Sequence, residues 1–370
     1  MQDADEAERR GDVAGALEVI MRRPLDQNGD LFWRLERIRR LRQLDELAPV
    51  LPAWVTSRWI LTQATQIIDD RDPGARSRRL RALDVAQELS GLDADEASSV
   101  SLMDHDWFYR QVLLWEEGAL GEFLSRSATP DLVAGADRIA EWAAAPMGGF
   151  VYLGAAAGRS RWTDLATGEV LTLDDIGSGS MLAPDVPAIG RLVPAGDGRM
   201  FESAPQETSL DVATAVAADP AGWLDVVRAA GDEFRCGEII PHVDDFGLVT
   251  DVARMQWLTW LAEWRPARGQ ALQVDDQLLA RTVVDRAARE LGLSEHRYLP
   301  PGEDYDAEEQ EGWEPWACLG AALLEPGLSE ALRAVVTTGD LGVLDQLRDR
   351  VADPARSLLG QVIASVQQAA

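Results

Sequence analysis

A glycine-rich stretch from about Met147 to Pro205 constrains the fold most, because it separates two long segments whose residue patterns are typical of helices. Glycine adopts the backbone angles that tight turns require, and it lowers the stability of helices. The glycines of this stretch are Gly148, Gly149, Gly154, Gly158, Gly168, Gly177, Gly179, Gly190, Gly196 and Gly198. We therefore expect short strands joined by tight turns here, with helices on both sides.

Two pairs of apolar runs within this stretch predict β-hairpins. In residues 161–173, two runs that carry apolar side chains flank a short polar turn. The second pair, 188–193 and 199–203, is joined through 195–198, which contains an Asp-Gly dipeptide. Asp-Gly between hydrophobic runs is a strong hairpin signal, because glycine takes the positive φ angle that the turn needs. The sequence thus predicts a small antiparallel sheet or barrel.

Apolar residues at spacings of three and four predict helices in most of the remaining chain. Before the glycine-rich stretch, the expected helices are 4–23, divided at Gly11-Asp12, then 30–47, about 54–69, 75–90, 94–104, 106–118 and 130–145. After it, they are 210–218, 221–231, 251–264, 273–292, 315–336, 340–352 and 354–368, with one strand expected at 246–250.

These expectations give a mostly α protein with a small antiparallel β domain, an α+β fold. We predict three domains. Residues 1–146 form a helical array, 147–206 the small sheet or barrel, and 207–370 a helical C-terminal bundle. Within the last of these, residues 300–314 are rich in carboxylates and contain no arginine, which predicts an exposed acidic loop.

Several classes of chemistry lack the residues that they need. The chain contains no lysine, so a phosphate-binding P-loop, a protein-kinase site and a Schiff-base mechanism are excluded. The cysteines Cys236 and Cys318 are far apart in sequence, and the three histidines are too scattered for a zinc motif. We therefore predict no cofactor and no metal.

The formal net charge of −28 bears on location and partners. Such a charge favours solubility and repels phosphate backbones, so we do not expect direct binding of nucleic acid. The N-terminal residues are acidic where a signal peptide would be basic, and no apolar run is long enough to span a membrane. We expect a cytoplasmic protein that does not contact a membrane.

Asp104, His105 and Arg191 are the candidate catalytic residues. In Asp104-His105-Asp106, a histidine stands between two carboxylates at the start of a helix, where it could serve as a general base. The structural interpretation, which we favour, is that Asp106 caps the helix while Trp107 packs inward. Arg191 is in the middle of an expected strand, where an inward-facing guanidinium would need an anionic partner.

A second set of candidates consists of tryptophans. Trp257, Trp260 and Trp264 lie on one face of an expected helix, either as a surface that anchors a partner or as core. Trp313 and Trp316 are beside the acidic loop and are more typical of a contact surface. These five residues are the candidates for an interaction with another protein.

Several blocks of the sequence together show a resemblance. They are Asp106–Gln111, Trp142 with Ala145–Met147, Asp164–Glu169, Gly190–Pro194 and Met200–Pro205. In these blocks the chain resembles a family of actinobacterial cytoplasmic proteins whose activity is uncharacterised. The central blocks are also similar to a small β domain found beside the SEC-C metal-binding motif, whose cysteine cluster is missing here. The resemblance implies the order of the domains and the cytoplasmic location, and it implies no activity.

The sequence favours a non-enzymatic interaction or scaffold protein whose partner is another protein. The alternative is an enzyme or small-ligand binder with a cleft between the β domain and the helices, near His105. A further possibility is that the acidic surface imitates a nucleic acid and occupies a basic groove on another protein.

Overall fold

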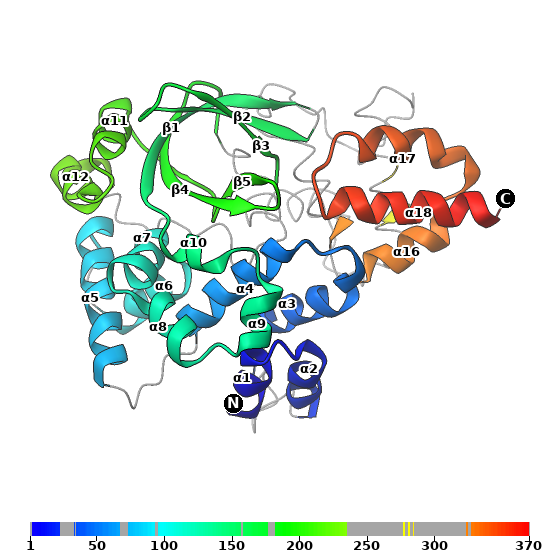
Figure 1. Ribbon diagram of the computed structural model, residues 1–370, viewed down its shortest axis with the longest axis horizontal. Coiled ribbons are helices and arrows are strands. Elements are labelled where there is room, and N and C mark those ends of the chain that lie inside the picture. The colour runs from blue at the N-terminus through cyan, green and yellow to red at the C-terminus, as the bar shows by residue number, and fades with distance from the viewer. Residues whose placement is uncertain are drawn as a thin grey trace, which may run out of the picture.

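The computed structural model describes residues 2–22, 33, 35–66, 73–92, 95–156, 158–176, 182–234, 277, 280–281, 284, 323–324 and 327–369. The expected strand 246–250, the helix 251–264 and the acidic loop 300–314 lie outside these residues. Within the described residues, the fold is mostly helical with one curled antiparallel sheet, as the sequence predicts (Figure 1).

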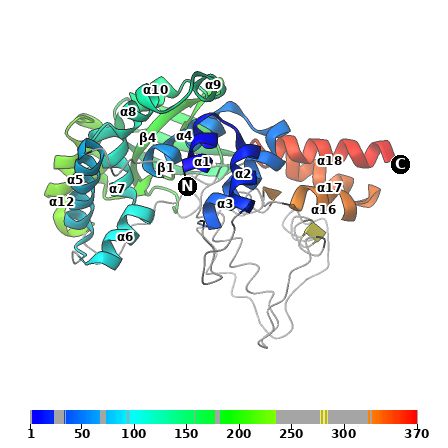
Figure 2. The ribbon, with the colours of Figure 1, turned by 90° about the horizontal axis from the view of Figure 1, so that it is seen from below.

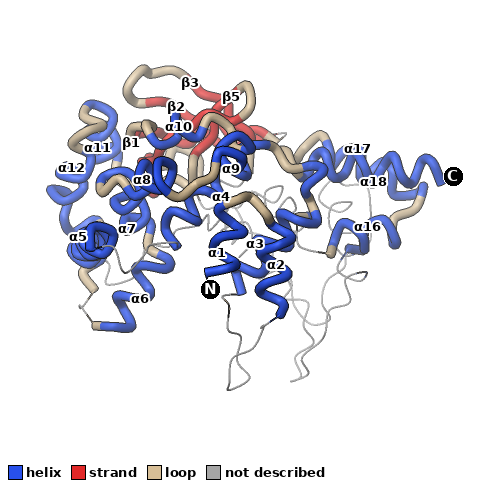
Figure 3. The backbone as a smooth tube through the Cα atoms, turned by 60° about the horizontal axis from the view of Figure 1, so that its bottom comes forward, coloured by secondary structure: helices blue, strands red, loops and turns tan. Residues whose placement is uncertain are grey.

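The N-terminal helices pack one after another beneath the sheet (Figure 3). The expected division of the first helix at Gly11-Asp12 is confirmed, because α1 ends at Arg9 and α2 begins at Val13. The elements are α1 (Gln2–Arg9), α2 (Val13–Arg22), α3 (Leu35–Glu46), the 3₁₀ turn η1 (Ala48–Val50) and α4 (Ala53–Gln66).

A second group of helices lies beside one end of the sheet. Its elements are α5 (Pro73–Ser90), α6 (Glu96–His105), α7 (Trp107–Gln111), the π-helical turn η2 (Val112–Glu116), α8 (Ala119–Arg126), α9 (Pro130–Gly135) and α10 (Ile139–Ala143). Periodicity alone predicts neither the π-helical turn nor α8. In Figures 1 and 2, α5 lies near the edge of the molecule that is farthest from the C-terminal helices.

The prediction of one helix over 130–145 is wrong, because Asp137 interrupts it. The Ser57 hydroxyl donates to the carbonyl oxygen of Asp137 at 3.1 Å, and the Asp137 amide donates to that hydroxyl at 2.9 Å. The Asp137 carboxylate also accepts from the Gly196 amide at 2.5 Å. Bonds to α4 and to a sheet turn thus replace the bonds of a continuous helix, a preference that a local pattern does not reveal.

The sheet is antiparallel, with the strand order β3-β2-β1-β4-β5, and β6 also pairs with β4. Both expected hairpins are present, as β2–β3 and β4–β5. The strands are β1 (Met147–Ala156), β2 (Arg159–Asp164), β3 (Val170–Asp174), β4 (Pro187–Ala195), β5 (Gly198–Phe201) and β6 (Gln206–Glu207). The sheet curls until the edge strands β3 and β5 approach each other, which gives a half-barrel.

Aromatic side chains fill the concave side of the half-barrel. Trp162 is fully buried and contacts Tyr152 and Phe201, with ring centroids 4.8 Å apart in both pairs. Phe150 meets Phe201 edge to face at 5.1 Å. Edge-to-face aromatic pairs stabilise a core beyond the burial of their area. The interior of the curl is therefore a packed core.

The helices α11 (Leu210–Ala218) and α12 (Trp223–Ala230) cover the outer side of β1 (Figure 1). Ser209 caps α11 by accepting from the Val212 amide at 3.4 Å. The backbone of α11 comes so close to β1 that a Cβ atom on Gly149 would lie 1.8 Å from the carbonyl oxygen of Ala213. Only glycine fits at this position.

The C-terminal helices lie at the opposite end of the molecule from α5 (Figures 1 and 2). They are α16 (Leu328–Val335), the 3₁₀ turn η5 (Thr338–Asp340), α17 (Leu341–Arg348) and α18 (Ala355–Ala369). The β1–β2 turn meets the connection between α17 and α18, where a Cβ atom on Gly158 would lie 3.0 Å from the main chain of Arg350 and Val351.

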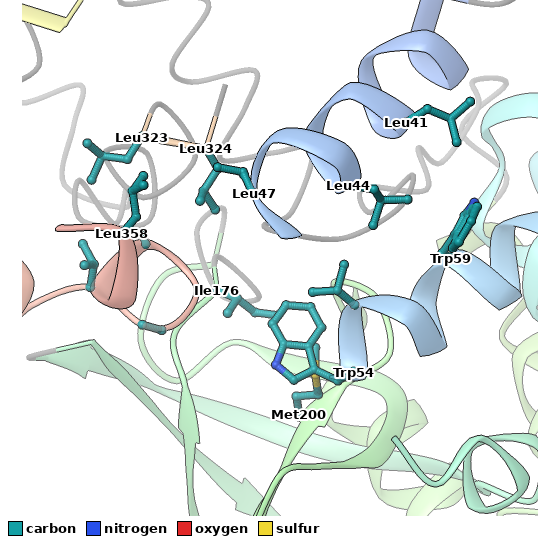
Figure 4. Close-up of a cluster of buried hydrophobic side chains, with 14 of the residues drawn as sticks. Leu41, Leu44, Leu47, Trp54, Trp59, Ile176, Met200, Leu323, Leu324 and Leu358 are labelled. Atoms are coloured by element: carbon teal, nitrogen blue, oxygen red, sulfur yellow. The ribbon is translucent and has the colours of Figure 1, made fainter. Parts of the chain in front are cut away.

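One hydrophobic cluster joins the three segments that the sequence predicts as domains (Figure 4). Leu44 and Trp54 come from the N-terminal helices, Met200 from the sheet, and Leu324 and Leu358 from the C-terminal part of the chain. The division into three domains stays a prediction, and the segments share this core.

Replacing Gly149 by alanine tests the contact between β1 and α11. The added methyl group must displace the α11 backbone, so we expect Gly149→Ala to lower the free energy of unfolding by about 1–3 kcal/mol or more. The control is Gly121→Ala in α8, where no heavy atom lies within 4 Å of the new Cβ and alanine favours helix. Equal effects of the two substitutions in urea denaturation would contradict the close contact.

Asp340 organises the start of the C-terminal helical pair. Its carboxylate accepts from the Thr337 amide at 2.8 Å, from the Thr337 hydroxyl at 2.9 Å, and from the Arg281 guanidinium at 3.1 and 3.2 Å. Partial burial acts to raise the pKa of Asp340, but the bonds from Arg281 and Thr337 lower it below its usual value overall.

A carboxyl group with a lowered pKa in the folded state stabilises the fold above its unfolded pKa, and this contribution is lost as the pH falls through the folded value. We expect Asp340→Asn to melt at a lower temperature than the wild type at neutral pH. The difference should shrink as the pH falls below the ordinary aspartate value of 3.8. Thermal melts from pH 7 to pH 3 measure it, and a difference that does not change with pH would refute this role.

Candidate functional site

The structure separates the residues that the sequence singles out. Asp104 and His105 end α6, and Arg191 is in the middle of β4. His105 is exposed, whereas Arg191 is 4% exposed. The five tryptophan candidates Trp257, Trp260, Trp264, Trp313 and Trp316 lie outside the described residues.

The Asp104-His105-Asp106 segment forms a helix junction. Asp106 is buried, and its Oδ1 accepts from the Tyr109 amide at 2.7 Å, which caps α7. Trp107 is buried directly after this cap, and its Nε1 donates to the carbonyl oxygen of Ala204 at 3.2 Å. The capping geometry accounts for Asp106, in agreement with the structural interpretation of this segment.

Arg191 is the centre of a buried polar network. Its Nε donates to Gln111 Oε1 at 2.9 Å, its Nη1 to the carbonyl oxygen of Ala145 at 2.6 Å, and its Nη2 to Glu116 Oε1 at 2.9 Å. Glu116 is the anionic partner that an inward-facing arginine requires. The three nitrogens of the guanidinium therefore connect α7, the π-helical turn η2 and the segment between α10 and β1 to β4.

Two indole rings enclose the same guanidinium. Its central carbon lies 4.7 Å from the ring centroid of Trp115 and 5.9 Å from that of Trp223. Trp223 Nε1 also donates to Glu116 Oε1 at 2.8 Å. Burial lowers the pKa of Arg191, while Glu116 and Glu202 act to raise it. The aromatic faces replace part of the hydration that the cation loses.

The π-helical turn explains how Gln111 and Glu116 reach the same arginine. In an α-helix, residues five apart point about 140° away from each other, because each residue turns by about 100°. A π-helix bonds residue i to residue i+5 and so places this pair on one side. The turn Val112–Glu116 has this geometry. The wider turn thus directs both side chains toward β4.

Glu202 extends the network into the core. It is 1% exposed, accepts from the Ser203 hydroxyl at 2.7 Å, and accepts from the Gln111 amide group. Arg110 Nη2 lies 3.9 Å from the Glu202 carboxylate. The groups of this network hold one another in place, and their arrangement is that of a connector between the sheet and the helices.

An open pocket lies elsewhere, between α5 and α6. Its volume is about 410 Å³, and its lining residues are Arg76, Arg79, Leu80, Leu83 and Met103. Met103 precedes the Asp104-His105 pair in sequence, and the lining given above contains neither Asp104 nor His105. The pocket is formed by two helices, whereas the expected cleft was between the sheet and the helices.

The lining residues of α5 share one helix face. Arg76, Arg79, Leu80 and Leu83 follow the spacing i, i+3, i+4, i+7. On α6, Val100 is one turn before Met103 on the same side and is 46% exposed, and Leu80 is 50% exposed. We call the six residues Arg76, Arg79, Leu80, Leu83, Val100 and Met103 the basic–apolar surface.

The arginines of α5 have two kinds of surroundings. Arg78 pairs with Glu122 of α8, and Arg81 donates two bonds to Glu117, with Nε at 2.9 and 3.0 Å from its carboxylate oxygens. These pairs fasten α5 to the rest of the helical group. Arg76 and Arg79 instead line the pocket.

Tyr109 is buried in the hydrophobic cluster that also contains Leu83 of the pocket lining. Burial raises the pKa of its phenol, Arg79 acts to lower it, and Asp104 acts to raise it. Arg79 and Asp104 are therefore both close to this ring. Tyr109 stays neutral and belongs to the packed core behind the surface.

The sequence analysis does not identify the basic–apolar surface. The signal is the run Arg76-Ser77-Arg78-Arg79-Leu80-Arg81, with basic residues on both sides of a leucine. The run alone does not indicate which arginines pair with distant carboxylates and which line the pocket. That distinction depends on Glu117 and Glu122, which are distant in sequence.

The described residues contain no group of three or more His, Cys, Asp or Glu side chains that could hold a metal ion. Nor does any helix among them combine the length and the apolar character needed to cross a bilayer.

Replacing Arg191 by methionine tests the network. The substitution leaves the buried acceptors Gln111 Oε1 and the Ala145 carbonyl oxygen without a donor, at about 1–3 kcal/mol of unfolding free energy each. The loss of the ion pair with Glu116 adds less, because Glu116 is 36% exposed and water screens it. Arg191→Lys should recover little, because an ammonium group cannot make the three divergent bonds.

The control is Arg159→Ala, on another strand of the same sheet. Arg159 pairs with Asp174 at 2.6 Å, and both side chains are 52% exposed, so its loss should cost no more than about 1 kcal/mol. Urea denaturation gives both values. Similar losses for Arg191→Met and Arg159→Ala would show that Arg191 does not connect the sheet to the helices.

No protein-family model matches the chain, and comparison with curated proteins and with solved structures found no match. The resemblance to an actinobacterial family therefore stays an expectation drawn from the sequence blocks given above.

Proposed function

We propose that the protein is a non-enzymatic interaction or scaffold protein that works in the cytoplasm, and that it binds another protein through the basic–apolar surface. The observation that carries this proposal is that Leu80 of α5 and Val100 of the adjacent helix α6 are each about half exposed, and that Arg76 and Arg79 line the same pocket as Leu80. Contiguous exposed apolar side chains with a polar rim are typical of interaction sites.

The residue types support this proposal. Arginine, methionine and aromatic residues are enriched at protein interfaces, whereas charged residues of other kinds are depleted at their centres. Arginine is also frequent among the residues that dominate binding energy. Leu83 and Met103 provide an apolar floor, and the two arginines provide charged groups at its border.

The charge of the whole chain makes this surface distinctive. The sequence has 63 acidic and 35 basic residues, yet residues 73–83 contain four arginines and no carboxylate. A local basic region on an acidic protein attracts an acidic partner. The surface therefore has its own electrostatic selectivity.

A second candidate function is binding of a small amphipathic anion in the same pocket. The pocket volume of about 410 Å³ is within the range of known ligand sites, about 300–1,000 Å³. The exposure of Leu80 favours the protein partner, because half of this side chain would remain in contact with water beside a small ligand.

A quantitative pull-down from native lysate tests the proposal. Wild-type protein should retain a stoichiometric partner, and the variant Leu80→Ser with Arg79→Glu should lose it, because the substitutions remove an apolar anchor and reverse a charge. The control variant, Arg22→Glu with Arg199→Glu, changes two exposed arginines away from this surface and should retain the partner.

Two results would contradict the proposal: no stoichiometric partner at low and moderate salt, or equal retention by both variants. A small carboxylate ligand that raises the melting temperature of the wild type, in the absence of any retained protein, would instead support the second candidate.

A further inference from the structure

We propose that the outward edge of β3 binds an extended, acidic segment of another protein, which adds a strand to the half-barrel. This second interaction surface is separate from the basic–apolar surface of the proposed function. The hydrogen-bond pattern of β3, the exposure of its residues and one arginine of β2 support it.

The hydrogen bonds at both ends of the β2–β3 ladder show which residues of β3 bind to β2. In an antiparallel ladder, pairs that exchange two backbone hydrogen bonds alternate with pairs that exchange none. At one end, the Asp164 amide donates to the carbonyl oxygen of Glu169 at 2.9 Å. At the other end, the Asp175 amide donates to the carbonyl oxygen of Gly158, also at 2.9 Å. The register between these ends is continuous, so counting from either end gives the same alternation.

This alternation leaves backbone groups of β3 that the sheet does not use. The bonded residues are Leu171 and Leu173. The N–H and C=O groups of Val170 and Thr172 therefore point away from β2, and we call these outward groups the β3 edge. Within the described residues, β3 is the last strand on this side of the sheet. Val170 is 52% exposed and Thr172 is also exposed, so the β3 edge belongs to residues that solvent reaches.

The other edge strand of the sheet, β5, is covered. The Glu202 amide donates to the carbonyl oxygen of Arg191 at 3.1 Å, so in the next pair of this ladder the groups of Phe201 point away from β4. The Phe201 carbonyl oxygen accepts there from Arg58 Nη2 at 2.8 Å. Arg58 is fully buried, so a side chain of α4 closes the β5 edge at this residue. An exposed strand edge is a template for pairing with another chain, and β3 provides one.

The two edge strands meet near the C-terminal end of β3. Figure 4 shows Ile176, which lies two residues after β3, and Met200 of β5 next to Trp54 in the shared hydrophobic cluster. Val170 is at the opposite end of β3, and Thr172 is at its middle. An added strand can therefore pair with these two residues from the exposed end of β3.

Arg161 of β2 favours an acidic occupant. It is exposed and directly opposite Thr172, and no residue in the described part of the chain binds its guanidinium. Arg159, on the same face, is already paired with Asp174 at 2.6 Å. A glutamate opposite Thr172 on the added strand would lie about 10 Å from the backbone of β2, which the two long side chains can bridge across the threonine.

A second copy of this chain fits the β3 edge less well. Two antiparallel β3 strands centred on Thr172 would place a neutral threonine where Arg161 needs an anion, and Asp174 is already bound by Arg159. The segment must be extended, because a helix has used its own backbone groups and cannot bond to a strand edge.

Short peptides test this inference with the full-length protein. We would use a labelled heptapeptide with glutamate at its centre, valines on both sides of the glutamate, and threonine and serine at the outer positions. Two further peptides have an N-methyl group, either on the glutamate or on the following valine. A fourth peptide has glutamine in place of the glutamate. Fluorescence anisotropy measures the affinity of each.

An N-methyl group on the glutamate should weaken binding by roughly fivefold or more, because it removes the N–H that bonds to Thr172. The same group on the following valine should have little effect, because that N–H points away from β3. Glutamine in place of glutamate should lower the affinity by about two- to fivefold, and Arg161→Gln should remove this difference.

Two more variants complete the test. Thr172→Pro removes the outward N–H without breaking the ladder to β2, and proline is tolerated at such edge positions, so this variant should fold and lose binding. Arg22→Gln changes an exposed arginine of α2 and should keep the preference for glutamate. The methylated peptides need only wild-type protein, so they decide the outcome even where a variant folds poorly.

Equal weakening by the two N-methyl groups, persistent binding to Thr172→Pro, or no binding of the acidic peptide would overturn the inference. Self-association of the wild type that Thr172→Pro abolishes, without peptide binding, would assign the β3 edge to a second copy and overturn it too. Each of these results leaves the proposed function intact, because the basic–apolar surface is not part of this edge.

Discussion

The structure depends on the burial of one cation, the guanidinium of Arg191, between the curled sheet and the helices. A buried charge is costly unless its partners are fixed, and here they come from the end of α7, from the π-helical turn, from Ala145 two residues before β1, and from two indole rings. Each of these contacts restricts a different element relative to β4. The network therefore fixes the helices relative to the sheet more specifically than apolar packing alone, because hydrogen bonds to a planar guanidinium require particular directions.

Much of the fold could be predicted from the sequence, because its signals are local. The glycine-rich stretch predicts the antiparallel sheet, Asp-Gly predicts the β4–β5 turn, and the break at Gly11 predicts the first helical hairpin. The failures occur where distant residues decide the local structure. Hydrogen bonds between Ser57 and Asp137 interrupt the helix expected over 130–145. A π-helical turn replaces part of the α-helix expected over 106–118, where Gln111 and Glu116 bind Arg191. The spacing of apolar residues within either segment does not reveal these contacts with distant residues.

The candidate site could not be predicted from the sequence either, because it also depends on residues that are distant in sequence. Asp104 and His105 have residue types that suggest chemistry, whereas the pocket is lined by Met103 and by residues of α5. The residues that line the pocket, including Arg79 and Leu80, appear ordinary in a chain with many arginines and leucines. Their significance arises only after Arg78 and Arg81 have paired with carboxylates of other helices. The surroundings of each arginine thus depend on residues that are distant in sequence.

The contact of Gly158 with Arg350 and Val351 has a consequence for how this molecule can vary. Main chain meets main chain there, so the junction between the β1–β2 turn and the C-terminal helices has little dependence on the identity of the surrounding side chains. Neighbouring residues can therefore be substituted during evolution without weakening this contact. Any side chain larger than hydrogen at position 158 would crowd the main chain of Arg350 and Val351, so Gly158 is the residue of this junction that is hardest to replace.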